Sequence, residues 1–127
     1  MADSTVAVVD DHPIVREGLI QVVRGFGGFR VIGAGDTAAD AVAMAQRDAP
    51  DILILDLGIP GTGMEAIRAI TQAGLRTRIL VLTISERPQD VMDAMRLGAA
   101  GYVLKGISGD ELKQVMNRLV NGIGHIT

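Results

Sequence analysis

Short apolar runs alternate with segments of helical period along the whole chain. Runs that favour strands occur at Val6–Val9, Phe29–Ala34, Ile52–Leu55, Ile79–Leu82 and Tyr102–Leu104. All but the second are nearly continuous in apolar residues, which is typical of central strands in a parallel sheet that is covered on both faces. The second run mixes polar and apolar positions and predicts an edge strand.

Between and after these runs, apolar residues recur at the spacing of one helix face. The stripes are Val15, Leu19, Val22, Val23 and Phe26; Ala38, Ala41, Val42 and Ala45; Ile67 and Ile70; Val91, Ala94 and Met95; and Leu112, Val115, Met116, Leu119 and Val120. The last stripe follows Ser108–Glu111, which has the spacing of a helix capping box.

The strand–helix order repeats five times, which predicts an α/β fold with right-handed crossovers. We therefore expect a five-stranded parallel sheet in a flavodoxin-like, doubly wound (βα)5 sandwich with strand order 2-1-3-4-5. Residues 1–122 are expected to form a single domain, and residues 123–127 to form a short tail or the start of a linker.

Composition narrows the classes of function. The 127 residues are 48% hydrophobic and 21% charged, as in a globular protein, and the absence of cysteine excludes disulfides and thiolate metal sites. A net charge of −3 without a Lys/Arg cluster argues against nucleic-acid binding by this chain itself. No apolar run approaches the length of a membrane span or a signal peptide, so a cytoplasmic protein is expected.

Polar residues stand where four of the predicted strands end. Asp10 and Asp11 follow the first strand, Asp56 follows the third, Thr83 follows the fourth, and Lys105 follows the fifth. Because ligands of open α/β sheets bind outside the carboxyl ends of the strands, we expect these side chains to converge on one edge. Lys105 is notable because the chain has only one other lysine, Lys113.

Three neighbouring carboxylates raise one another's pKa unless a cation compensates them. An incomplete shell of oxygen ligands favours Mg²⁺, which commonly shares its shell with a phosphate. A carboxylate in such a site is able to attack phosphorus and form an aspartyl phosphate. Lys105 and the hydroxyl of Thr83 are then suited to hold the phosphoryl oxygens.

At these residues the sequence resembles the receiver domain of two-component response regulators over essentially its whole length. The matching elements, in order, are Val-Val-Asp10-Asp11-His12-Pro13, Asp56-Leu-Gly-Ile-Pro60-Gly61, Thr83 and Gly101-Tyr102-Val-Leu-Lys105. The local sequence around the acid pair and around Lys105 resembles that of receivers of the LuxR/NarL/FixJ type, which precede a helix-turn-helix domain.

The resemblance implies that Asp56 is the phosphoacceptor. It implies that Asp10, Asp11, Asp56 and the carbonyl of Gly58 hold Mg²⁺, and that Thr83 and Lys105 grip the phosphoryl group.

The resemblance also implies a switch, with Thr83 and Tyr102 as its moving parts, rather than an enzyme that turns over a separate substrate. The expected partners are a histidine kinase and, on phosphorylation, a second copy of the chain. DNA binding is expected only through an output domain outside this chain, and no membrane is involved.

The sequence departs from the family pattern near the acceptor. Pro60–Gly63 is one residue shorter than the usual Pro-Gly-x-x-Gly, and Gly58 leaves no side chain over the site. Ile84 follows Thr83 where a small residue is usual, and its bulk is expected to narrow access. Gly106 stands where many relatives have proline.

Other interpretations remain open from the residues alone. Asp11 is also suited to cap a helix that begins with Pro13, and neither His12 nor His125 has Cys/His companions that would mark it as a ligand. An aspartyl-phosphate phosphatase would need a second acid where Gly58 stands. A flavin-binding module would need aromatics and a hydroxyl-rich phosphate loop, whereas Asp10 and Asp11 repel phosphate.

Overall fold

The computed structural model describes residues 3–126, with side chains through Gly124. Residues 1, 2 and 127, which belong to the expected domain and tail, lie outside this range. Strands and helices alternate as predicted. They are β1 (Ser4–Val9), α1 (Pro13–Arg24), β2 (Phe29–Gly35), α2 (Ala38–Asp48), β3 (Ile52–Leu55), α3 (Gly63–Gln72), β4 (Arg78–Thr83), α4 (Pro88–Leu97), β5 (Gly101–Leu104), α5 (Gly109–Val120) and β6 (His125–Ile126).

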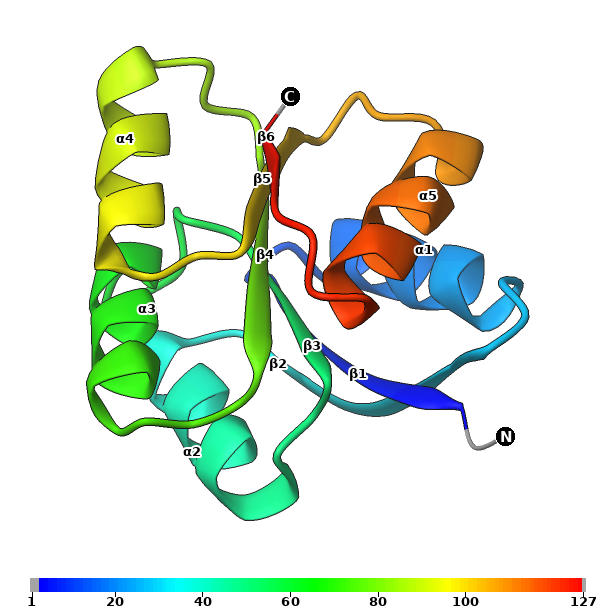
Figure 1. Ribbon diagram of the computed structural model, residues 1–127, viewed down its shortest axis with the longest axis horizontal. Coiled ribbons are helices and arrows are strands. Elements are labelled where there is room, and N and C mark those ends of the chain that lie inside the picture. Colours follow the sequence, from blue (N-terminus) through cyan, green and yellow to red (C-terminus); the bar gives the residue numbers. More distant parts are fainter. Residues whose placement is uncertain (1–2, 127) are drawn as a thin grey trace.

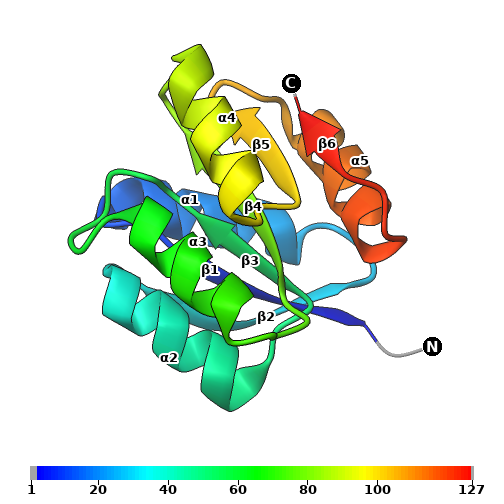
Figure 2. The same cartoon turned by 60° about the vertical axis from the view of Figure 1, so that its left-hand side comes forward.

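The strands form one parallel sheet in the order β2-β1-β3-β4-β5-β6. The order 2-1-3-4-5 and the edge position of β2 are thus confirmed. The five expected strands are all present, and the two-residue strand β6 extends the sheet beside Gly101 and Tyr102 of β5 (Figure 2). A strand of two residues is too short to show a hydrophobic pattern in the sequence, because only its backbone pairing defines it.

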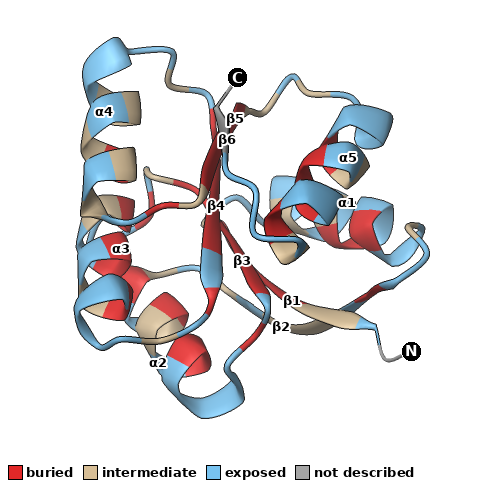
Figure 3. Ribbon diagram, viewed as in Figure 1, coloured by how far each residue is buried: buried red, intermediate tan, exposed pale blue. Residues whose placement is uncertain are grey.

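Two helical layers cover the sheet. Helices α1 and α5 lie on one face, and α2, α3 and α4 lie on the other (Figure 1). Successive side chains of a strand point to opposite faces, so Ile52 and Ile54 of β3 join the core under α1 and α5, whereas Leu53 and Leu55 join the core under α2–α4. The buried positions concentrate in the strands between these layers (Figure 3). Within residues 3–126, no helix has the length and apolar character that a bilayer span requires.

The helix starts show which local predictions succeed. Ser108 caps α5 by accepting a hydrogen bond from the backbone N–H of Glu111, as the capping-box pattern predicts. The proposed cap by Asp11 is wrong: the N-cap of α1 is His12, and it makes no side-chain capping bond. Pro13 begins the helix, as expected, because its missing N–H has no helical partner to lose. The carboxylate of Asp11 is therefore not used by α1.

Candidate functional site

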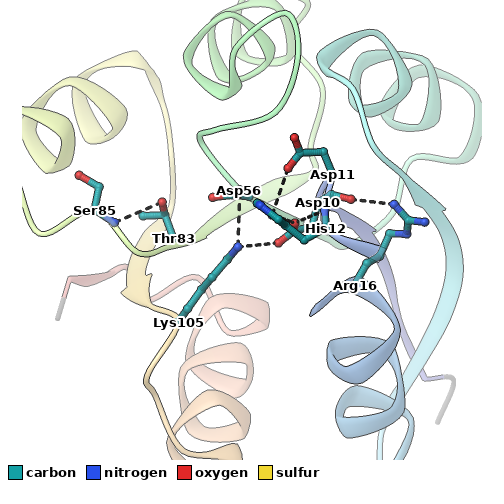
Figure 4. Close-up of polar contacts among 8 residues, drawn as sticks. All are labelled: Asp10, Asp11, His12, Arg16, Asp56, Thr83, Ser85 and Lys105. Atoms are coloured by element: carbon teal, nitrogen blue, oxygen red, sulfur yellow. Dashed lines mark hydrogen bonds and ion pairs between the residues drawn. The ribbon is translucent and has the colours of Figure 1, made fainter. Parts of the chain in front are cut away.

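The site forms where β1 and β3 lie side by side at the centre of the sheet. Val9 pairs with Leu55, so Asp10 and Asp56 follow neighbouring strands at the same edge. The backbone N–H of Asp56 donates to the carbonyl of Val9, which fixes the carboxyl ends of β1 and β3 relative to each other. Figure 4 shows the side chains of Asp10, Asp11, Asp56, Thr83 and Lys105 gathered at this edge, as the sequence predicts.

Asp10 is 3% exposed, and each of its carboxylate oxygens has at least one polar partner. Oδ1 accepts from the backbone N–H of His12 at 2.8 Å and lies 3.0 Å from His12 Nδ1, and Oδ2 lies 2.8 Å from Lys105 Nζ. Burial raises the pKa of Asp10, but the hydrogen bonds from Lys105 and His12 together hold that pKa below its ordinary value of 3.8. Asp10 is therefore ionised in this site.

Asp56 is 5% exposed, and Lys105 Nζ lies 3.4 Å from its Oδ2. Lys105 thus bridges two buried carboxylates from its place after β5. Burial lowers the pKa of Lys105, but the hydrogen bond to Asp10 and the charges of Asp56 and Asp10 hold that pKa above its ordinary value of 10.5. The ammonium is a fixed positive charge beside the Asp56 oxygen.

Asp11 differs from Asp10 in having an unmatched oxygen. Its Oδ1 is shielded from solvent and forms no hydrogen bond, although His12 Nδ1 lies 3.2 Å away. A shielded carboxylate oxygen without a donor is costly, and a cation supplies what is missing. The oxygens of Asp10, Asp11 and Asp56 form a donor set suited to Mg²⁺, so the residues fit the ion that the sequence implies.

A hydrogen-bonded chain links the end of β4 to β5. Thr83 is buried, and its Oγ1 accepts from the backbone N–H of Ser85 at 3.4 Å. The hydroxyl of Tyr102, a fully buried side chain, donates to the carbonyl of Ser85 at 3.0 Å. The hydroxyl of Ser85 donates to Asp90 of α4. The sequence singled out Thr83 and Tyr102, but it gave no sign that Ser85 joins them to α4.

The site opens to solvent through a cavity of about 560 Å³ whose lining includes Asp56, Gly58, Thr83, Ile84 and Lys105. Ile84 is 81% exposed, so its side chain lies on the wall of the entrance instead of in the core. A Cβ at Gly58 would lie 3.6 Å from Asp56 Oδ2, at ordinary contact distance. The absence of a side chain there leaves one side of Asp56 open.

In the shortened loop after Asp56, the backbone of Gly63 lies close to that of Leu57. The N–H of Gly63 donates to the carbonyl of Leu57 at 3.1 Å, and a Cβ at Gly63 would lie only 2.7 Å from Leu57 Cα. Thr62 has a φ of +64° and caps α3 by accepting from the N–H of Glu65. Glycine at 63 is what allows α3 to begin directly against the acceptor segment. The peptide bond between Lys105 and Gly106 is trans, because no cis peptide bond occurs among the described residues.

Two residues contact this site that the sequence pattern does not single out. His12 has no Cys/His companions, yet its ring faces the carboxylates of Asp10 and Asp11. Arg16 reaches back from the first turn of α1, and its Nη1 donates to the carbonyl of Asp10 at 2.8 Å. The position of His12 directly after the acid pair is the sequence feature that could have indicated its contact with these carboxylates.

Comparison with known proteins points to one family. The model of the response regulator receiver domain matches residues 6–117. A nitrate/nitrite response regulator protein homolog of Haemophilus influenzae is 32% identical over 118 residues, which make up 92% of this chain and 57% of that protein. The chain thus spans a little over half the length of the curated relatives it matches.

Solved structures of response regulators are also similar to this chain. The signal receiver domain of the putative response regulator NarL from Mycobacterium tuberculosis is 31% identical, with a TM-score of 0.93 over 96% of this chain and 99% of that chain. A two-component response regulator of the LuxR family from Aurantimonas is 34% identical, with a TM-score of 0.92 over 98% of this chain and 89% of that chain.

Proposed function

The chain belongs to the response regulator receiver domain family, in its LuxR/NarL-type branch, and on that premise we propose that Asp56 is the phosphoacceptor of a two-component signalling switch. Receiver domains are signalling proteins rather than classical enzymes, and they generally bind Mg²⁺ at an acidic pocket. The observation that carries the proposal is a buried Asp56 carboxylate that faces an open cavity and has Lys105 beside it.

In the proposed transfer, an oxygen of Asp56 attacks the phosphorus of a phosphohistidine on the kinase. The new O–P bond forms as the N–P bond breaks, and the released imidazole takes up a proton. Lys105 offsets the negative charge of the phosphoryl oxygens, and the Thr83 hydroxyl donates to one of them. Asp10, Asp11, Asp56 and the Gly58 carbonyl would hold Mg²⁺, which neutralises charge on the phosphoryl oxygens when bound.

We propose that the readout runs through Thr83, Ser85 and Tyr102. When Thr83 turns to a phosphoryl oxygen, it gives up the N–H of Ser85, whose carbonyl holds Tyr102. Tyr102 lies on β5 and Ser85 contacts Asp90 of α4, so the change reaches the surface of α4, β5 and α5. Two faces are proposed for dimerisation: this surface, where β6 pairs with the outer edge of β5, and the face formed by α1 and α5. The phosphate shifts this equilibrium only as far as its contacts differ between the two states.

DNA binding, in this proposal, belongs to a helix-turn-helix output domain elsewhere in the same protein, as in LuxR-type regulators. The partial length match and the net charge of −3 support that division of labour. A phosphatase is not favoured, because Gly58 stands where the second acid would be needed and leaves that side of Asp56 open.

Labelling with acetyl phosphate and Mg²⁺ tests the proposal. We expect one phosphoryl group per chain by intact mass, and reductive trapping with borohydride is expected to yield homoserine at position 56. Asp56→Asn is expected to remove the label, and Asp51→Asn, at the other end of the same strand, to retain it. The proposal fails if the wild-type chain takes no label or if Asp56→Asn is labelled equally well.

A further inference from the structure

His12 presents a ring nitrogen to the acidic cluster although most of its side chain is exposed. Nδ1 lies 3.0 Å from Asp10 Oδ1 and 3.2 Å from Asp11 Oδ1. The backbone N–H of the same residue donates to the same Asp10 oxygen at 2.8 Å. The ring is thus tethered through its own main chain at the edge of the site (Figure 4).

The form of the ring that carries its hydrogen on Nε2 leaves this arrangement unbalanced. Nδ1 and the two aspartate oxygens then face one another as three lone-pair donors, and only Asp10 Oδ1 has a hydrogen bond, from the backbone N–H of His12. Asp11 Oδ1 is indeed shielded from solvent and without a hydrogen bond. A single metal ion between these atoms satisfies all of them at once.

The spacing of the atoms matches a shared metal ion. Two donors bound about 2.1 Å from one octahedral ion at right angles lie about 3.0 Å apart. The distances of 3.0 and 3.2 Å from His12 Nδ1 to the two aspartate oxygens agree with such an edge. Including Asp56, the donor atoms of the four residues all lie within 4.8 Å of one another.

We propose that His12 is a metal ligand, so that this site binds a borderline transition-metal ion such as Co²⁺, Ni²⁺ or Zn²⁺ through one nitrogen and several oxygens. The inference rests on the cation site of the proposed function and adds a preference among ions to it. Imidazole is a good ligand for these ions, whereas Mg²⁺ prefers oxygen and keeps its waters. His12 therefore contributes to transition-metal binding and little to Mg²⁺ binding.

The test compares Co²⁺ and Mg²⁺ binding to the whole chain by calorimetry in three proteins: wild type, His12→Ala and His125→Ala. His125 is the other histidine of the sequence and serves as the matched control. We expect His12→Ala to weaken Co²⁺ binding by at least about tenfold and to change Mg²⁺ binding by less than about twofold. His125→Ala is expected to match wild type with both ions.

A spectroscopic signature separates ligation from a general effect on the fold. With Co²⁺ bound, a hyperfine-shifted imidazole N–H resonance is expected in the proton NMR spectrum of wild type and of His125→Ala, and not in that of His12→Ala. Mg²⁺-dependent labelling by acetyl phosphate reports whether the His12→Ala site is intact.

The outcomes distinguish the two proposals. Equal Co²⁺ affinity in wild type and His12→Ala, with labelling intact, overturns the role of His12 and leaves the phosphoacceptor proposal standing. Failure of both Mg²⁺ and Co²⁺ to bind wild type overturns the cation site itself. Loss of Co²⁺ affinity and of the shifted resonance in His12→Ala alone establishes the ligand.

Discussion

Strand β3 has an aspartate directly before it and another directly after it, and the two behave differently. Asp51, at the amino end, accepts hydrogen bonds at Oδ2 from the backbone N–H and the hydroxyl of Thr5, at 2.8 and 3.3 Å. Its own N–H donates to the Thr5 hydroxyl at 3.0 Å. Asp56, at the carboxyl end, is buried, and among the described residues its ion pair is with Lys105 at 3.4 Å.

This difference supports the proposal that Asp51 is a structural acid and Asp56 a chemical one. Asp51 is exposed, and its hydrogen bonds tie the start of β3 to β1, which is a role in stability. Asp56 is kept among other carboxylates, where its charge is costly and its oxygens stay available. Residue type and place beside a strand are the same in both. Burial, together with carboxylate oxygens that are free to coordinate a ligand, is what distinguishes the proposed phosphoacceptor.

The largest expected effect comes from removing the cation beside Asp56. Lys105→Met is expected to slow labelling by acetyl phosphate by about 10²–10³-fold, because charge stabilisation of the phosphoryl oxygens is lost. Lys113→Met, which changes the other lysine, is expected to leave the rate unchanged. Initial rates from intact-mass measurements decide this. An unchanged rate in Lys105→Met would break the comparison, because burial beside a cation would then not distinguish Asp56.

A methyl group at Gly63 is expected to disturb the carboxyl end of β3. In Gly63→Ala the new Cβ would meet Leu57 Cα at 2.7 Å and the Asp56 carbonyl oxygen at 2.9 Å, both backbone atoms with little room to move. We expect a loss of about 1–3 kcal/mol in the free energy of unfolding, measured with urea.

Gly106→Ala is the control for this loop, because a Cβ there meets nothing within 4 Å. It is expected to leave stability unchanged or slightly raised. Equal stability of the two variants would show that the close contact of Gly63 with the backbone of Asp56 and Leu57 does not contribute to the stability of the fold.

The fold could be predicted from the sequence, and so could the convergence of the site residues on one edge of the sheet. Both follow from the hydrophobic pattern and from the parallel strand order that it indicates. Buried parallel strands need continuous apolar runs, and parallel topology sends residues such as Asp10, Asp56 and Lys105 to one edge. The comparisons confirm the family and the fold. The assigned roles in phosphorylation and switching remain predictions for the experiments above.

What the sequence did not predict depends on individual hydrogen bonds rather than on a repeating pattern of residues. The strand β6 exists because its backbone pairs with β5, and the ring position of His12 depends on a hydrogen bond from its own N–H to Asp10. The positive φ of Thr62 follows from the loop having to close against Leu57. None of these has a periodic signature in the chain.

Stability measurements are expected to give opposite signs at the two ends of β3. Asp51→Ala loses the hydrogen bonds with Thr5 and is expected to lower the free energy of unfolding by about 1–2 kcal/mol. Asp56→Asn removes a buried charge that lies among like charges, and in metal-free buffer it is expected to raise that free energy by about 1 kcal/mol. Urea unfolding of both variants beside wild type measures the difference, and a shared sign would contradict it.

The smallest expected effect is a change in the acid dependence of stability. The pKa of Asp10 lies below 3.8 in the folded chain, because the hydrogen bonds from Lys105 and His12 outweigh the opposing effect of burial. A lowered carboxyl pKa adds stability that is present above the ordinary value and is lost as the pH falls through the folded value. Wild type is therefore expected to lose this contribution below about pH 3.8.

Lys105→Met is expected to flatten that loss, because only the hydrogen bonds from His12 then oppose the effect of burial on the pKa of Asp10. In metal-free buffer, the gap in unfolding midpoint between Lys105→Met and wild type is expected to narrow as the pH is lowered from 5 to 3. Lys113→Met is expected to follow the wild-type curve throughout. Parallel curves for Lys105→Met and wild type would mean that the lowered pKa of Asp10 is due to the hydrogen bonds from His12 and not to the lysine that also lies beside Asp56.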